Sequence, residues 1–353
     1  MITGEPKVKG RNSLGHENRQ AAILGIDTSC YTTSVAVVGG KSLVIDRRLL
    51  LEVPLGKRGL RQAEAVFQHV KNLPLLLAEV LPRGDMVGVA VSSKPRSGSG
   101  SYMPVFKAGE AIARSLALAW DVPCFLTSHQ AGHIWAGLWG GEICPHGRFL
   151  ALHISGGTTE IVSVGFGEVA GEGEDLMEIE HIGGSLDIHA GQLIDRIGVK
   201  MGLPFPAGPR LERLAIDGRQ RGIPPFILPV SVSGLHLNFS GPETAAIRAL
   251  EAGSEPAGVA QGIERCVAES LTALVKHAAA ASDLNRVLVV GGVAANQHVR
   301  RYLENHLEKV GINTAFAPRG LSSDNAVGVA AYGRWRALGK MKSTDCLGQH
   351  RID

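Results

Sequence analysis

Apolar and polar residues follow one another in short blocks along most of the chain, and the blocks are of two kinds. Short β-branched runs such as residues 86–93, MVGVAVSS, predict buried strands, and longer segments with apolar residues at helical spacing predict amphipathic helices. Strands that alternate with helices indicate parallel sheets with helices packed on their faces. The predicted strands are 43–51, 86–93, 123–128, 176–182, 286–292 and 313–317, and the predicted helices are 61–80, 105–120, 188–201, 208–218, 243–252, 257–281, 296–309 and a last one from 324.

Two further segments share one skeleton. Residues 23–38 read ILGIDTSCYTTSVAVV, and residues 149–164 read FLALHISGGTTEIVSV. Each has an apolar strand, a turn of small polar residues, a Thr-Thr pair and a second β-branched strand. The repeat predicts an α/β protein of two similar halves, each a mixed sheet with helices on both faces. A cleft between such halves is a natural place for a nucleotide.

The same pattern predicts where the chain divides. The Gly- and Pro-containing stretch 140–148, GGEICPHGR, separates a first unit at 21–140 from a second at 141–340, whose last helix can pack back on the first. Residues 1–20 are expected to form a flexible tail, and 341–353 a second tail. The first tail is polar, and no 18-residue apolar span occurs, so the sequence predicts a cytoplasmic protein outside the membrane.

Composition excludes few classes of function. The net charge of +3 neither demands nor excludes a nucleic-acid partner, and 5% aromatic residues argue against a base-stacking platform for single strands. Five cysteines without a C-x-x-C pair are typical of a reducing compartment. The 45 glycines exceed the average share of about 7% and predict tight turns or close backbone–ligand contacts.

The clearest candidate chemistry is a histidine pair. His129 and His133 in TSHQAGHIW are four residues apart, so on a helix both imidazoles face one side and can bind one ion. The spacing matches the metallopeptidase motif H-E-x-x-H, but Gln130 replaces the general base, which argues against a peptidase. Asp324 in LSSDNAVG can supply a carboxylate, or it can cap the helix predicted to begin there. Such a set suits iron or zinc.

Glycine-rich loops predict a nucleotide site. Ser155, Gly156, Gly157 and Thr158 form the turn of the second hairpin, where backbone N–H groups and hydroxyls can surround a phosphate, although a plain turn remains the alternative. Gly291 and Gly292 end an apolar strand, and Asn296 after them can cap a helix or bind a ligand hydroxyl. Gly208 lies between prolines before a helix, a position that suits an anion, and Asp195 is either a contact or solvated surface.

Taken together, the segments GIDTSC, ARSLALAWDVP, SHQAGHI, ISGGTTEIVSV, LPFPAGP, VVGGVAAN and SDNAVGVAA resemble one family from about residue 22 to 338. It is the tRNA threonylcarbamoyladenosine transferase family, TsaD or Gcp, formerly described as O-sialoglycoprotein endopeptidases. The resemblance implies the two-domain actin/Hsp70-like ATPase fold. It also implies that His129, His133 and Asp324 are metal ligands. Ser155 to Thr158 would be the substrate loop, with Asp195, Gly208 and Asn296 as further contacts to the adenylate.

The resemblance also implies an activity and partners. Family members transfer a threonylcarbamoyl group from its AMP anhydride to N6 of adenosine 37 in tRNA, using one divalent metal ion. They work with an inactive homologue and a small ATPase, so a homo- or heterodimer is implied. Candidate contacts to tRNA phosphates, for which a solvated face is the alternative, are Arg47, Arg48, Lys57, Arg58, Arg61, Arg210 and Arg213.

Several positions depart from the family pattern. Tyr31 and Thr32 stand where the family has an Asp-Glu pair, which leaves the catalytic residues unidentified. The family's SGGHT is SGGTT here, and its A-x-G-P-G-L loop is SSKPRSGSG at 92–100. A family lysine is Arg196, and FSGLK is FSGPE at 239–243. Two hypotheses therefore stay open: an active transferase, or a paralogue that binds metal and nucleotide as a regulatory subunit or as a carbamoyltransferase with another acceptor.

Overall fold

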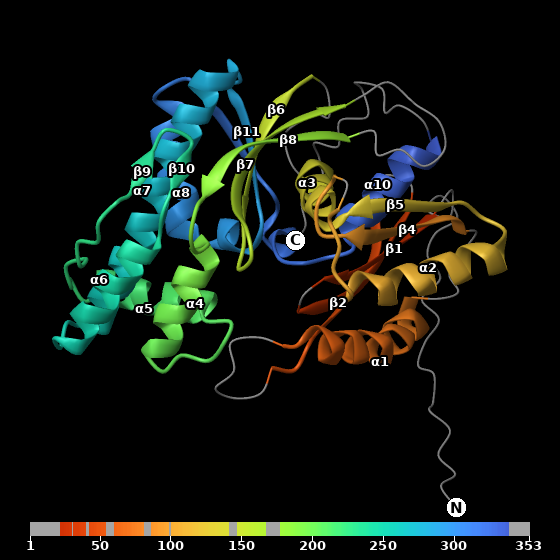
Figure 1. The fold of residues 1–353 in the computed structure, drawn as a ribbon, viewed down its shortest axis with the longest axis horizontal. Helices are drawn as coiled ribbons and strands as arrows, with labels where there is room; N and C mark the ends of the chain where they lie inside the picture. The colour runs from red at the N-terminus through yellow and green to blue at the C-terminus, as the bar shows by residue number, and fades with distance from the viewer. Residues whose placement is uncertain are drawn as a thin grey trace, which may run out of the picture.

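The computed structural model places two sheets with helices around and between them (Figure 1). It describes residues 22–29, 31–39, 42–53, 60–80, 86–98, 100–140, 147–166 and 177–338. The predicted tails, Lys57, Arg58 and most of the predicted break at 140–148 lie outside these residues. The domain limits therefore stay predictions, and we call residues 22–140 and 147–338 the two halves of the chain.

The first sheet has the strand order β3-β2-β1-β4-β5. Its strands are β1 (Ala22–Ser29), β2 (Thr32–Gly39), β3 (Ser42–Leu50), β4 (Met86–Lys94) and β5 (Cys124–Ser128). β2 is antiparallel to β1 and β3, whereas β4 is parallel to β1 and β5. β1 is buried along its whole length, as the near-continuous apolar run predicts for a central strand covered on both faces.

The second sheet repeats this order and extends it. Its strands are β6 (Phe149–Ile154), β7 (Thr159–Phe166), β8 (Met177–Ser185), β9 (Val232–Ser233), β10 (His236–Leu237), β11 (Arg286–Val290) and β12 (Asn313–Phe316). The order is β12-β11-β6-β7-β8-β10-β9, so β8-β7-β6-β11-β12 copies β3-β2-β1-β4-β5 in order and direction. The predicted α/β fold of two mixed sheets is confirmed. β9 and β10 were not predicted, since two residues are too few to show a period.

Most helices cover the outer faces of the sheets. α1 (Gln62–Val80) and α2 (Phe106–Trp120) bury their apolar residues against the first sheet. The second sheet shares one large core with its own helices. These helices are α4 (Ala190–Lys200), α5 (Gly208–Gln220), α6 (Ser240–Glu251), α7 (Pro256–Ser282) and α8 (Gln297–Glu308).

Two helices lie between the sheets. α3 (His129–Gly140) and α10 (Val327–Leu338) share one core with the first sheet and another with the second (Figure 1). They cross at very short range, because a Cβ on Gly328 would lie 1.9 Å from the carbonyl oxygen of Gly132. Small residues at the crossing therefore bring the start of α10 close to the first turn of α3.

Element ends differ from the prediction mainly near the C-terminus. The last helix begins at Val327 and not at 324, after the short α9 (Arg319–Ser322), and the 3-10 turn Gly292–Ala295 precedes α8. In the part of the chain that the structure describes, every helix is too short or too polar to span a membrane.

Candidate metal centre

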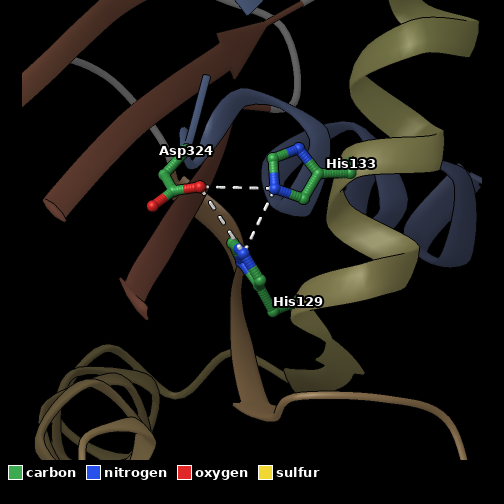
Figure 2. A group of neighbouring side chains, drawn as sticks. All are labelled: His129, His133 and Asp324. Carbon is green, nitrogen blue, oxygen red and sulfur yellow. Dashed lines mark hydrogen bonds and ion pairs between the residues drawn. The ribbon is translucent and has the colours of Figure 1, made fainter. Parts of the chain in front are cut away.

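The two predicted histidines and Asp324 meet at one point (Figure 2). His129 is the first residue of α3 and His133 lies one turn later, so the helix directs both imidazoles to the same side. Their Nε2 atoms are 3.1 Å apart, and Oδ1 of Asp324 lies 3.6 Å from that of His129 and 3.4 Å from that of His133. Residues nearly 200 positions apart in sequence therefore share one site.

Asp324 is available for this site because a neighbouring residue caps the helix. Oδ1 of Asn325 accepts hydrogen bonds from the N–H groups of Val327 (3.0 Å) and Gly328 (3.2 Å). The alternative prediction, that Asp324 begins or caps the last helix, is wrong. Its carboxylate lies before the helix and faces the two histidines.

A second carboxylate orients the first histidine. Nδ1 of His129 lies 3.1 Å from Oδ2 of Asp27, which is fully buried on β1 and also accepts a hydrogen bond from the Ser92 hydroxyl. Metal-binding histidines typically donate their other ring N–H to a carboxylate in this way. Asp27 was not predicted from the sequence, although a single acidic residue inside the apolar strand of GIDTSC is a usable signal.

The electrostatics favour a cation. Burial alone would lower the pKa of His129, but Asp27 and Asp324 outweigh it and raise that pKa to about 9. Burial and the neighbouring His129 lower the pKa of His133 to about 4. Burial would raise the pKa of Asp324, but the hydrogen bond from His133 and the charge of His129 hold it well below its usual range. Two carboxylates thus surround two imidazoles.

The donor set fits a single divalent ion. Metal–ligand bonds of about 2.1 Å place neighbouring donors about 3.0–3.4 Å apart in tetrahedral or octahedral geometry. The three donor–donor distances here, 3.1, 3.4 and 3.6 Å, lie close to that range. Two imidazoles and one carboxylate leave coordination positions open for a substrate, and they suit iron or zinc.

The predicted substrate loop adjoins a helix N-terminus. Ser155 N–H donates to the Thr158 carbonyl at 2.7 Å, which closes the turn between β6 and β7, and Gly191 N–H at the start of α4 donates to the Ser155 carbonyl at 3.2 Å. Gly156 and Gly157 are exposed, and a Cβ on either would meet nothing within 4 Å. The N–H groups of Ala190 and Gly191 are already bonded to Thr159 Oγ1 and to the Ser155 carbonyl, so the exposed glycines of the turn, and not the end of α4, are the part open to an anion.

The structure also connects Asp195 with Gly208. Oδ1 of Asp195 accepts a hydrogen bond from Ala207 N–H at 2.7 Å, and Gly208 is the first residue of α5. Burial raises the pKa of Asp195. Asp195 is therefore not solvated surface, since it joins α4 to the start of α5.

Gly291 and Asn296 have structural functions that the sequence only partly revealed. Gly291 has φ +95°, and a Cβ there would lie 2.4 Å from the Ile154 carbonyl oxygen, whereas Gly292 has open space. Oδ1 of Asn296 accepts from Val299 N–H at 3.0 Å, and its amide donates to Glu264 at 2.8 Å. The capping alternative for Asn296 is confirmed, and its contact with an adenylate stays a prediction.

The residues that replace the family's acidic pair have different environments. Thr32 is buried at the start of β2. Tyr31 is half-buried in the turn before it, and its ring lies edge-on to Phe205 of the second half, with centroids 5.8 Å apart. Arg196 and Glu243, which also depart from the family pattern, form an ion pair in which Nη1 of Arg196 lies 3.2 Å from Oε2 of Glu243.

The candidate tRNA contacts divide into two groups. Arg47 pairs with Glu79 at 2.6 Å, and Arg48 bonds to Asp46 and to the carbonyl of Gly320, so both are used within the chain. Arg61, Arg210 and Arg213 are exposed.

The chain is similar to known proteins over most of its length. The family model described as TsaD, tRNA N6-adenosine threonylcarbamoyltransferase, matches residues 58–331. Proteins of that name from two strains of Thermus thermophilus are each 32% identical to this chain. The matches cover 90% and 89% of this chain and 92% of each relative.

Solved structures of low sequence identity share the fold. The activator of 2-hydroxyisocaproyl-CoA dehydratase from Clostridium difficile, with bound ADPNP, has a TM-score of 0.52 at 16% identity and covers 91% of this chain and 100% of its own. Full-length HypF, in a phosphate- and nucleotide-bound form, has a TM-score of 0.55 at 12% identity and covers 91% of this chain and 47% of its own. The fold is thus the actin/Hsp70-like one, and by its matched length and identity the chain belongs to the TsaD family of tRNA N6-adenosine threonylcarbamoyltransferases.

Proposed function

We propose that this protein uses a metal ion to transfer a threonylcarbamoyl group from threonylcarbamoyl-AMP to N6 of adenosine 37 in tRNA. The observation that carries the proposal is the position of the metal donors beside the glycine loop. The ring centroid of His153 lies 4.8 Å from that of His133, and Gln130 donates to Glu160 at 2.6 Å. His153 and Glu160 lie on either side of residues 155–158 in the sequence. The metal donors on α3 and the glycine loop are therefore neighbours.

Each part of the site has a distinct task in this reaction. His129, His133 and Asp324 would hold iron or zinc, and Asp27 fixes the orientation of His129. A bound ion supplies a Lewis acid for the acyl carbonyl. The turn at 155–158 binds the adenylate phosphate through its exposed glycines. Gln130 donates its amide to Glu160 and has no basic group, which disfavours a peptidase.

A second candidate function is supported by Tyr31. An aromatic ring in contact with Phe205 stands where family members have a carboxylate, which favours a paralogue that binds metal and nucleotide but modifies another acceptor or regulates a partner. Under the first proposal the partners are tRNA, an inactive homologue and a small ATPase. Under the second, tRNA is not the acceptor.

A transfer assay separates the two. Metal-loaded protein is incubated with preformed threonylcarbamoyl-AMP and unmodified tRNA, with and without a bacterial extract that supplies partner subunits. We expect modified adenosine with the unaltered protein, none with His129→Ala, and an unchanged yield with His277→Ala, whose histidine contacts Gly234 away from the site. Metal and donor binding without transfer under either condition would favour the paralogue.

A further inference from the structure

Glu160 is a buried carboxylate at the meeting point of the two halves, separate from the three metal donors. It is 3% exposed, and three side chains surround it. The Gln130 amide donates to Oε1 at 2.6 Å, Nη2 of Arg96 lies 3.3 Å from Oε2, and Nδ1 of His153 lies 3.6 Å from Oε1. Burial alone would raise the pKa of Glu160, but His153, Arg96 and Gln130 lower it. Glu160 is therefore a fixed anion.

Arg96 is bound to this anion on one side only. Its side chain is 50% exposed, whereas that of Glu160 is 4% exposed. Among the residues that the structure describes, Glu160 is the one ion-pair partner of its guanidinium. A guanidinium carries five N–H donors. Glu160 thus holds one end of the Arg96 guanidinium and leaves most of its donors for a ligand.

The backbone fixes Arg96 beside the metal centre. Gln130, which follows the metal donor His129, donates its N–H to the Pro95 carbonyl at 3.0 Å. The hydroxyls of Ser97 and Ser128 are 3.0 Å apart. On the other side, Glu160 lies two residues after Thr158 of the predicted substrate loop. Arg96 therefore lies between the metal donors and that loop, in a segment that departs from the family's A-x-G-P-G-L pattern.

We propose that Arg96, held in position by Glu160, binds an oxyanion of the acyl donor. The inference rests on the proposed function, in which the donor carries two oxyanions: the phosphate bonded to the acyl group and the carboxylate of the threonyl group. A planar guanidinium binds either of them through two parallel hydrogen bonds, which a lysine cannot do. Arg96 is then a substrate-binding residue and Glu160 a positioning residue.

Equilibrium binding to the full-length, metal-loaded protein tests this. The probes are AMP and a non-hydrolysable analogue of threonylcarbamoyl-AMP, and the variants are Arg96→Ala, Arg96→Lys and Glu160→Gln. Arg114→Ala is the matched control, because Arg114 is 53% exposed and pairs with Glu110 on the outer helix α2. Melting temperature and metal content are measured for each variant.

Loss of a charged hydrogen-bonding group should weaken binding about ten- to a hundredfold in Arg96→Ala. We expect partial rescue in Arg96→Lys, a smaller loss in Glu160→Gln and none in Arg114→Ala. An equal loss for both probes identifies the phosphate as the ligand, and a loss confined to the acyl analogue identifies the carboxylate. In the transfer assay the same variants should raise KM more than they lower kcat. Loss of a residue that only stabilises the fold would not produce this difference.

Unchanged affinity of Arg96→Ala for both probes would overturn the inference while leaving the proposed function intact. If Arg96→Ala does not fold, Arg96→Lys decides, since an affinity equal to that of the unaltered protein contradicts a bidentate contact. Arg96-dependent binding of the analogue without any transfer to tRNA would instead overturn the proposed acceptor and support the inference. Binding of neither probe to the unaltered protein would overturn both.

Discussion

The close crossing of α3 and α10 should be sensitive to a single methyl group. A Cβ at position 328 would lie 1.9 Å from the Gly132 carbonyl oxygen and 2.5 Å from the Ala136 amide nitrogen, both of them backbone atoms. Ordinary contact begins at 3.4 Å, so Gly328→Ala has to separate the helices by the difference, about 1.5 Å. Overpacking of this kind costs about 1–3 kcal/mol, and we expect about 3 kcal/mol because backbone cannot rotate away.

This cost should appear in both stability and metal binding. With an unfolding entropy of about 2.1 cal/mol/K per residue, a loss of about 3 kcal/mol in a chain of 353 residues corresponds to a melting temperature lower by about 4 °C. Separation of the helices also moves Asp324 away from His133, 3.4 Å distant at present, so metal affinity should fall about ten- to a hundredfold. Thermal unfolding and competition with a chromophoric chelator measure the two effects.

Gly241→Ala is the control, since a Cβ there meets nothing within 4 Å and the residue lies in α6. Alanine in a helix is more favourable than glycine by up to about 1 kcal/mol, so this variant should melt at the same or a higher temperature. If Gly328→Ala melts and binds metal like the unaltered protein, the crossing of α3 and α10 does not determine the metal site.

Three further predictions concern other parts of the molecule. Burial lowers the pKa of His69 to about 4 while its Nδ1 lies 2.9 Å from the Thr33 hydroxyl, so the unfolded chain binds a proton that the folded protein does not as pH falls below 6.5. His69 alone should lower the free energy of unfolding by about 2 kcal/mol between pH 7 and pH 5, and His69→Gln should remove that contribution; equal pH dependence of the two proteins in urea titrations would contradict the reasoning. The rings of Tyr31 and Phe205 should show a coupling of about 0.5–1.5 kcal/mol in a double-alanine cycle, and additive losses would mean that the contact does not join the halves. Zinc at a thousandfold excess over its Kd should stabilise the chelator-treated protein by about 4 kcal/mol and leave His133→Ala unshifted, and an equal shift in that variant would place the ion elsewhere.

Local patterns predicted the parts of the site that lie on one element. The spacing of His129 and His133 fixes their common face, and the repeated hairpin predicted two similar halves, which agrees with the strand order that the two sheets share. Helical period and turn composition need no knowledge of distant residues, which is why these predictions were confirmed.

Pairs that form between distant segments were not predictable in the same way. Asp27 and His129 are 102 positions apart, and Arg96 and Glu160 come from different halves of the chain. The sequence around either residue of such a pair does not indicate which distant residue it will contact. The capping of α10 by Asn325 was missed for another reason, since two adjacent residues, Asp324 and Asn325, are both good caps and only the packing decides between them.

The path of the chain through α9 and α10 has a consequence for biosynthesis. After β12 the chain leaves the second sheet, passes Asp324 and inserts α10 against the first sheet, which completes the core around Ile23 and Ala90. During translation, His129 and His133 are therefore synthesised long before Asp324. Until then the nascent protein has two imidazoles and an incomplete core, so binding of the proposed metal ion and completion of the first half should coincide, after translation has passed residue 338.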